Sequence, residues 1–267
     1  MTAVTGVAVS CGWRVCLGDR VAAGDVPILI GVGVLAGIVS TVASLASIIS
    51  YPALLAIGLP PLSANVTNTV ALMFTGVGAA LGSRPELRGQ GGLVGRLGLV
   101  TVMGGATGAA LLLVTPAETF EAAAPWLVGA ASLTLLLNRA AERPKHGAHR
   151  RALLVALFGV ALYVGYFGAA GGILMLAVLT ALVDRPSATV NAIKNAVAGM
   201  ANGVAAIGFA AFGPVRWGAA VPLAVGFLAG GWLGPALVRR LPGRTLRVGV
   251  GLCGLAVAVK LGVDTYR

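Results

Sequence analysis

The sequence predicts an all-α protein that crosses a membrane many times, and three observations support this fold class. Of the 267 residues, 58% are hydrophobic and only 10% are charged, whereas soluble domains carry about 25% charged residues. The mean hydropathy is +0.95. No charged residue occurs in residues 26–83, and other long uncharged runs follow. Because a spanning helix needs roughly 20 apolar residues, we expect about eight spans, or about seven to ten depending on how interrupted helices are counted.

The positive charge of the chain predicts membrane topology rather than nucleic-acid binding. The net charge is +11, but the basic residues are concentrated in short loops between apolar runs. Such loops stay on the cytoplasmic side and contact anionic lipid. We therefore expect a multi-pass protein of the plasma (inner) membrane, with the bilayer as partner and no nucleic acid. The loops expected in the cytoplasm are 83–96, 139–151 and 239–247.

The apolar runs predict two transmembrane repeats that are homologous to each other and joined by the most basic loop. The expected divisions are an N-terminal arm at 1–25, a first repeat at 26–138, a cytoplasmic linker at 139–151, a second repeat at 152–263 and a tail at 264–267. The arm has mixed charges and no long apolar core, so we do not expect a cleaved signal peptide.

Each repeat opens with an apolar segment that is too long for one simple span. Residues 26–60 contain a run of small and polar residues at 40–47, and residues 152–183 contain a glycine-rich run at 165–172. Such runs interrupt helices, so we expect each segment to form a pair of short helices or a broken helix folded as a hairpin.

The remaining helices begin after turns that contain proline. We expect a helix at 64–82 with Ser63 as its N-cap, and a helix that runs to about 212 with Ser187 as its N-cap. Further spans are expected at 97–114, 123–138, 217–238 and 247–263. The loop between the first two of these holds Glu118 and Glu121 and no base, which is typical of the outside.

The loop charges favour an inverted relation between the two repeats. A basic loop follows helix 64–82 directly in the first repeat, whereas the basic loop of the second repeat follows one helix later. If both over-long segments fold as hairpins, each repeat makes an odd number of passes and the two have opposite orientations. The alternative is two parallel sets of four spans, and it would place the four arginines of the loop 239–247 outside. We therefore predict inverted repeats with the C-terminus outside.

The 40 glycines indicate close helix contacts. Several have the small-xxx-small spacing that lets helix backbones approach each other in membranes. These are Gly78 and Gly82, Gly104 and Gly108, Gly226 and Gly230, and Gly230 and Gly234. We interpret them as packing positions rather than as phosphate-binding loops.

A candidate binding site centres on Lys194, which lies well inside an otherwise uncharged apolar segment. On a helix, Asn191, Asn195 and Asn202 share a face with this lysine. A lysine at the centre of a bilayer costs about 2.5–3.5 kcal/mol on insertion scales, so an ionisable group there indicates function. The alternative is that the ammonium group snorkels from the helix N-terminus to the lipid headgroups.

The first repeat carries a similar stretch with Asn65, Thr67 and Asn68. Five of the six asparagines of the chain lie in these two stretches. Amide and hydroxyl donors, the ammonium group and the N-termini of half-helices together describe a midplane pocket for a small anion. The alternative is that the asparagines only hydrogen-bond neighbouring helices, at about 0.6 kcal/mol each.

Several other function classes lack the residues that they need. No Asp or Glu lies deep in a predicted span, both histidines lie in the basic loop 139–151, and the three cysteines form no metal-binding or disulfide pattern. We therefore expect no catalytic residue, metal or cofactor. An anion that leaves down a negative-inside potential gains about 2.3 kcal/mol per charge per 100 mV, so anion export would need no coupling ion.

Three stretches of the chain resemble a known transporter family. They are residues 37–72 (GIVSTVASLASIISYPALLAIGLPPLSANVTNTVAL), residues 165–206 (GYFGAAGGILMLAVLTALVDRPSATVNAIKNAVAGMANGVAA) and residues 230–242 (GGWLGPALVRRLP). Over residues 27–263 the chain resembles the TauE/SafE family of sulfite exporter-type permeases. The resemblance implies two homologous halves and transport of sulfite, sulfonates or related organosulfur anions across the plasma membrane.

The first helix interruption departs from the family pattern. The usual Gly-Gly-Gly is replaced by Ala-Ser-Leu-Ala-Ser, which places Ser44 and Ser47 at the expected pocket, whereas the second interruption keeps Gly171 and Gly172. We therefore predict a permease for small anions that works by alternating access around these residues. A non-transporting membrane subunit that binds a partner is the alternative, a membrane-embedded enzyme is the least supported, and a homo-oligomer is compatible with the sequence.

Overall fold

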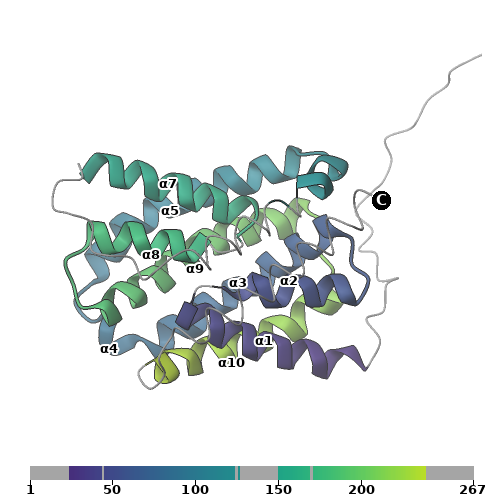
Figure 1. Cartoon of the computed structure of the whole chain (residues 1–267), viewed down its shortest axis with the longest axis horizontal. Coiled ribbons are helices and arrows are strands. Elements are labelled where there is room, and N and C mark those ends of the chain that lie inside the picture. Colours follow the sequence, from purple (N-terminus) through teal and green to yellow (C-terminus); the bar gives the residue numbers. More distant parts are fainter. Residues whose placement is uncertain (1–23, 44, 124–125, 127–149, 169–170, 239–267) are drawn as a thin grey trace, which may run out of the picture.

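Every regular element in the described part of the chain is an α-helix, in agreement with the predicted fold class. The computed structural model describes residues 24–43, 45–123, 126, 150–168 and 171–238. Its helices lie roughly along one direction and form a bundle (Figure 1). They are α1 (Asp25–Ala43), α2 (Ala46–Ala56), α3 (Pro61–Gly82), α4 (Arg84–Leu87), α5 (Gly91–Val114), α7 (Arg150–Tyr166), α8 (Gly171–Leu182), α9 (Ser187–Phe212) and α10 (Trp217–Val238).

Both over-long apolar segments are pairs of helices, as the sequence predicts. In the first, α1 ends at Ala43 and α2 begins at Ala46. In the second, α7 ends at Tyr166 and α8 begins at Gly171. After α7 the chain turns at Gly168, whose φ of +78° is a left-handed conformation that glycine adopts without strain. The two members of each pair remain in contact.

The two predicted helix caps are wrong. Ser63 is the third residue of α3 and Ser187 is the first residue of α9, and neither makes a side-chain cap. The N-cap positions are Pro60 and Pro186 instead, and Pro61 is the first residue of α3. A proline ring fixes φ near the helical value, so it begins a helix without a hydroxyl acceptor.

The predicted loop 83–96 is largely helical. It contains α4 and the first residues of α5, which begins before the predicted start at 97. Arg84 and Arg96 lie in helices and Arg88 in the turn that follows α4, and all three are exposed, so they place their charge at the surface. The end of α5 at Val114 and the bounds of α10 agree with the predicted spans.

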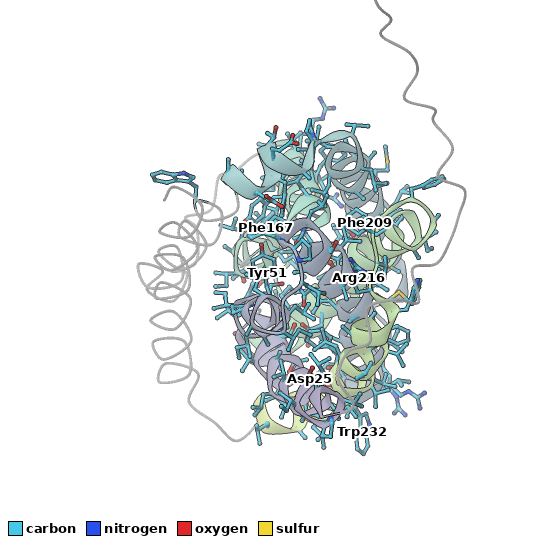
Figure 2. All side chains as sticks on the ribbon, turned by 90° about the vertical axis from the view of Figure 1, so that its right-hand side faces the viewer. Asp25, Tyr51, Phe167, Phe209, Arg216 and Trp232 are labelled. Atoms are coloured by element: carbon cyan, nitrogen blue, oxygen red, sulfur yellow. The ribbon has the colours of Figure 1, made fainter. Side chains whose placement is uncertain are left out.

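The chain is a multi-pass membrane protein. Among the described helices, α3, α5, α9 and α10 are long and apolar enough to cross a membrane, and α1, α2 and α8 are shorter apolar helices. Large apolar side chains such as Leu99, Ile207 and Trp232 are exposed on the outside of the bundle. Figure 2, an end-on view, shows Trp232 at the periphery. This exposure suits contact with lipid.

Two helices pack mainly against the other part of the chain: α5 of the part before residue 124, and α10 of the part after residue 149. α5 packs against α7 and α9, whereas α10 packs against α1 and α3. Glycines make these contacts close: a Cβ on Gly104 or Gly108 would meet the backbone of α7, and a Cβ on Gly226 or Gly230 would meet the backbone of α1. Gly78, Gly82 and Gly234 are also in close contact with a neighbouring helix. The packing interpretation of these glycines is therefore confirmed.

Several predicted segments lie outside the described residues. They are the N-terminal arm before residue 24, the span at 123–138 beyond its first residues, the linker 139–149, the arginine-rich loop 239–247, the span at 247–263 and the C-terminal tail.

Candidate functional site

The two helix interruptions and the helices α3 and α9 line a small polar cavity. Its volume is about 50 Å³. A water-sized sphere needs roughly 10–15 Å³, so the cavity has room for a solute of about four non-hydrogen atoms. The described residues that give it polar side chains are Ser40, Ser47, Thr75, Lys194, Asn195 and Asn202.

Lys194 is buried in the wall of this cavity. Its side chain is 1% exposed, although it is the eighth residue of α9. An ammonium group that snorkelled to the headgroups would be exposed at the end of the bundle, so the structure contradicts that alternative. Lys194 is also the one residue with a formal charge among the described residues that line the cavity.

Three uncharged polar groups of the cavity wall have no hydrogen-bond partner in the protein. They are the hydroxyl of Thr75, the side-chain nitrogen of Asn195 and the side-chain oxygen of Asn202. The exposed fractions of these residues are 4%, 7% and 6%. Burying a polar group without a partner costs about 1–3 kcal/mol, so the arrangement indicates a bound solute or water.

The first turns of two short helices also face the cavity. Ala46 and Ser47 begin α2, Gly172 is the second residue of α8, and all three line the cavity. The first N–H groups of a helix have no partner within it, and they carry the positive end of the helix dipole. Leu45 precedes α2 and provides no side-chain cap. The cavity is therefore electropositive from its backbone as well as from Lys194.

Asn65 and Asn191 are not in the cavity wall, and they make equivalent contacts across the molecule. Each is the fifth residue of its helix, α3 or α9. The amide of Asn65 donates to the carbonyl of Tyr166 at 3.0 Å, and the amide of Asn191 donates to the carbonyl of Thr41 at 3.0 Å. Each asparagine thus satisfies an otherwise unpaired carbonyl at the end of the other part's interrupted helix.

Asn68 and Thr67 also have structural partners. Asn68 donates to the hydroxyl of Ser47 at 3.2 Å and accepts from the hydroxyl of Ser50 at 2.6 Å, so it fixes the first turns of α2. The hydroxyl of Thr67 accepts from the backbone N–H of Arg216, just before α10, at 3.0 Å. For these two residues the structure therefore agrees with the alternative to a binding site, in which polar side chains only hydrogen-bond neighbouring parts of the bundle.

The predicted site residues therefore fall into three groups. Those that line the cavity are Ser47, Gly172, Lys194, Asn195 and Asn202. Those that lie outside the lining are Asn65, Thr67, Asn68, Gly171 and Asn191, and Ser44 is outside the described residues. Gly171 is buried against Val164, where a Cβ would collide with the valine side chain.

The prediction missed Ser40, Thr75 and Gly168, which also line the cavity. A signal for Thr75 was present, because it lies seven residues after Asn68 and therefore on the same helix face. Ser40 belongs to the small polar run that interrupts the first segment, and Gly168 belongs to the glycine-rich run of the second.

An aromatic cluster lies directly beside the second interruption. The rings of Tyr51 and Phe167 are 5.7 Å apart in an edge-on contact, and Phe120 contacts the rings of both Tyr166 and Phe167. Tyr51 and Phe167 lie close together in the end-on view (Figure 2). Phe167 is followed directly by Gly168 of the cavity lining, so the cluster fixes the chain next to the cavity.

A second, larger cavity of about 280 Å³ lies between α3 and α10. Apolar residues such as Val70, Phe74 and Trp217 form its entire described lining. It offers no partner for a charged solute, so the smaller polar cavity is the candidate site.

A lipid-exposed helical bundle around a small, electropositive cavity is typical of a membrane transport protein for a small anion. The chain belongs to the TauE/SafE sulfite exporter family, since the family model "Sulfite exporter TauE/SafE" matches residues 29–261. Membership implies a membrane transporter of sulfite or related anions. No curated protein and no solved structure matches the chain.

Proposed function

We propose that this protein carries sulfite or a related small oxyanion across the plasma membrane by alternating access around the polar cavity. The observation that carries the proposal is the burial of Lys194 beside the unpaired side-chain nitrogen of Asn195. Removing an ammonium group from water costs several kcal/mol after relaxation. No carboxylate is found among the described lining residues. A bound anion would accept a hydrogen bond from the Asn195 amide and lie beside a positive charge.

Alternating access requires two structural units that rock against each other around a fixed site, and inverted repeats supply them. The reciprocal hydrogen bonds of Asn65 and Asn191 support such repeats here. The exchange of α5 and α10 supports them as well, because each packs on the interrupted helix of the other part. In this proposal residues 26–138 and 152–263 are the two units, and the loops 83–96, 139–151 and 239–247 face the cytoplasm.

Transport is better supported than the two alternatives. A subunit that only binds a partner has no need of a buried cation in a polar cavity at the centre of its bundle. A membrane-embedded enzyme is also less supported, because the family is one of transporters.

The test is anion flux into or out of liposomes that contain the purified full-length protein. We expect sulfite flux in the wild type, driven by a membrane potential without a proton or sodium gradient. Lys194→Met keeps most of the length of the side chain and removes its charge, so it should reduce flux at least about tenfold, the effect of 1.4 kcal/mol. Arg96→Gln is the matched control, because it removes an equal charge from an exposed position.

Three outcomes decide the proposal. Insertion and thermal stability of each variant are measured in the same preparations, so a folding defect is separated from a transport defect. If Lys194→Met inserts normally and still carries sulfite at the wild-type rate, the cavity is not the transport site. If no anion crosses with the wild type, transport itself is rejected. A strict need for a proton or sodium gradient would reject only the uncoupled mechanism.

A further inference from the structure

We propose that the cavity selects a monovalent oxyanion that retains one proton, such as hydrogensulfite, over a dianion of similar size. This inference rests on the proposed function, because it names the ionic form of the solute that the same site takes. It is carried by three properties of the cavity: its formal charge, its unpaired hydrogen-bonding groups and its volume.

The formal charge of the cavity favours a monovalent solute. Lys194 contributes one positive charge, and the other described lining residues contribute none. A monoanion beside the ammonium group makes the pair neutral. A dianion would leave one uncompensated negative charge in a poorly solvated interior, which is strongly unfavourable. The dipoles of α2 and α8 add partial positive charge, but not a second full charge.

The unpaired groups favour a solute that both donates and accepts hydrogen bonds. The side-chain nitrogen of Asn195 can only donate, and the hydroxyl of Thr75 can donate or accept. The side-chain oxygen of Asn202 can only accept. A fully deprotonated oxyanion offers acceptors alone, so it would leave the oxygen of Asn202 without a donor. An oxyanion with one O–H group offers these groups both a donor and acceptors.

The volume suits a small oxyanion. About 50 Å³ accommodates roughly four non-hydrogen atoms, the size of a central atom with three oxygens. A sulfonate with a carbon chain would need the walls to move. Gly76 and Gly199 cross closely at this wall, where a Cβ on Gly76 would lie 2.5 Å from the Cα of Gly199, so the two helices leave little room between them there.

Charged groups on the helices that pack against α9 lie outside the cavity lining. They are Arg84 and Glu86 of α4, Arg96 of α5, and Arg150 and Arg151 of α7, whereas α3 and α8 carry no charged residue. The titratable group in the described lining is therefore Lys194. A pH dependence of binding must come either from this lysine or from the anion, and the experiment has to separate the two.

The experiment measures binding of three anions to the purified full-length protein from mildly acidic to mildly alkaline pH. Sulfite takes up a proton within this range and is kept under nitrogen to prevent its oxidation. Chlorate is the matched control, because it is a pyramidal monoanion with three acceptor oxygens and no proton at any of these pH values. Sulfate is the dianion. Isothermal titration gives each dissociation constant.

We expect the apparent affinity for total sulfite to fall as the pH rises, in proportion to the fraction of hydrogensulfite. Chlorate should bind at all pH values with constant affinity, about tenfold weaker than hydrogensulfite because Asn202 gains no donor. Sulfate should bind more weakly than either. In Asn202→Ala, sulfite at mildly acidic pH should lose its advantage over chlorate.

The outcomes separate this inference from the proposed function. Sulfite affinity that rises with pH, or sulfate that binds as well as chlorate, overturns the inference and leaves transport intact. A parallel fall of sulfite and chlorate affinity assigns the titration to Lys194 and also overturns it. If no anion binds at any pH, the cavity holds water only and the proposed site fails. The comparison of anions needs no variant, so it decides even if Asn202→Ala does not fold.

Discussion

Asn68 and Lys194 are each the eighth residue of a helix, α3 and α9, and they meet different surroundings. Asn68 is held between the hydroxyls of Ser47 and Ser50 and lies outside the cavity lining. Lys194 lines the cavity. The two parts of the chain are therefore not equivalent at this level, because one supplies a fixed amide and the other supplies the charge.

Replacing Asn68 by leucine should destabilise the protein without removing any group of the cavity lining. The change removes two buried hydrogen bonds to α2 and leaves Ser47 without its donor, which costs about 1–3 kcal/mol. The measurement is thermal unfolding in detergent. Thr107→Val is the control, since that hydroxyl is exposed and bonds only within its own helix. Equal melting temperatures for Asn68→Leu and the wild type would contradict the structural role.

At the scale of single residues, the sequence predicts which side chains share a helix face. It does not predict which of them hydrogen-bond to distant parts of the chain. The facial spacing located Lys194, Asn195 and Asn202, which do line the cavity. The same reasoning included Asn65 and Thr67, whose partners are Tyr166 and Arg216, more than 100 residues away along the chain. Contacts of that kind depend on how the helices pack, and no local pattern encodes them.

Helix interruptions and helix crossings determine where the cavity can form. Both interruptions were predictable, because a single helix could not accommodate such long segments with small or glycine-rich runs at their centres. The first residues of α3 and α9 were not, because a serine shortly after a proline resembles a cap in sequence while the proline sets the backbone geometry at the helix start. The crossing of α3 and α9 at Gly76 and Gly199 brings their polar faces to the same cavity.

Gly76→Ala should weaken this crossing. The new methyl group would lie 2.5 Å from the Cα of Gly199, so the backbones must separate. We expect a loss of about 1–3 kcal/mol of stability, as for other overpacked contacts, together with reduced anion flux. Gly203→Ala on α9 is the matched control, because a Cβ at this position would have no atom within 4 Å and alanine favours the helix. Similar thermal stability in both variants would contradict a tight crossing.

At the scale of the whole molecule, the exchange of α5 and α10 makes the two parts of the chain interdependent. Each interrupted helix packs on a helix from the other part, α1 on α10 and α7 on α5. The sequence indicated two related units through their repeated stretches, and it indicated close packing through glycine spacing. It did not indicate which helices would be partners, because small-xxx-small spacing marks a contact face without naming the helix that it meets.

The orientation of the two units in the membrane is testable from opposite ends of the bundle. α5 has 24 residues, which corresponds to about 36 Å at 1.5 Å per residue, enough to cross the roughly 30 Å apolar layer. Gly92 near its start and Thr119 beyond its end are both exposed. In a variant with Cys11, Cys16 and Cys253 changed to serine, we expect an impermeant maleimide to label Thr119→Cys on intact cells. Gly92→Cys should react only after permeabilisation.

Two further cysteines distinguish inverted from parallel repeats. Ala56 is the last residue of α2, just before α3, and Ala188 lies at the start of α9, which contacts α4. Both are exposed. In inverted repeats the starts of α3 and α9 face opposite sides of the membrane. Ala56→Cys should then be labelled on intact cells, as Thr119→Cys is. Ala188→Cys should be labelled only after permeabilisation, as Gly92→Cys is. In parallel repeats both would be labelled from one side. That result would remove the basis for alternating access between two mirrored units, while leaving the cavity itself in place.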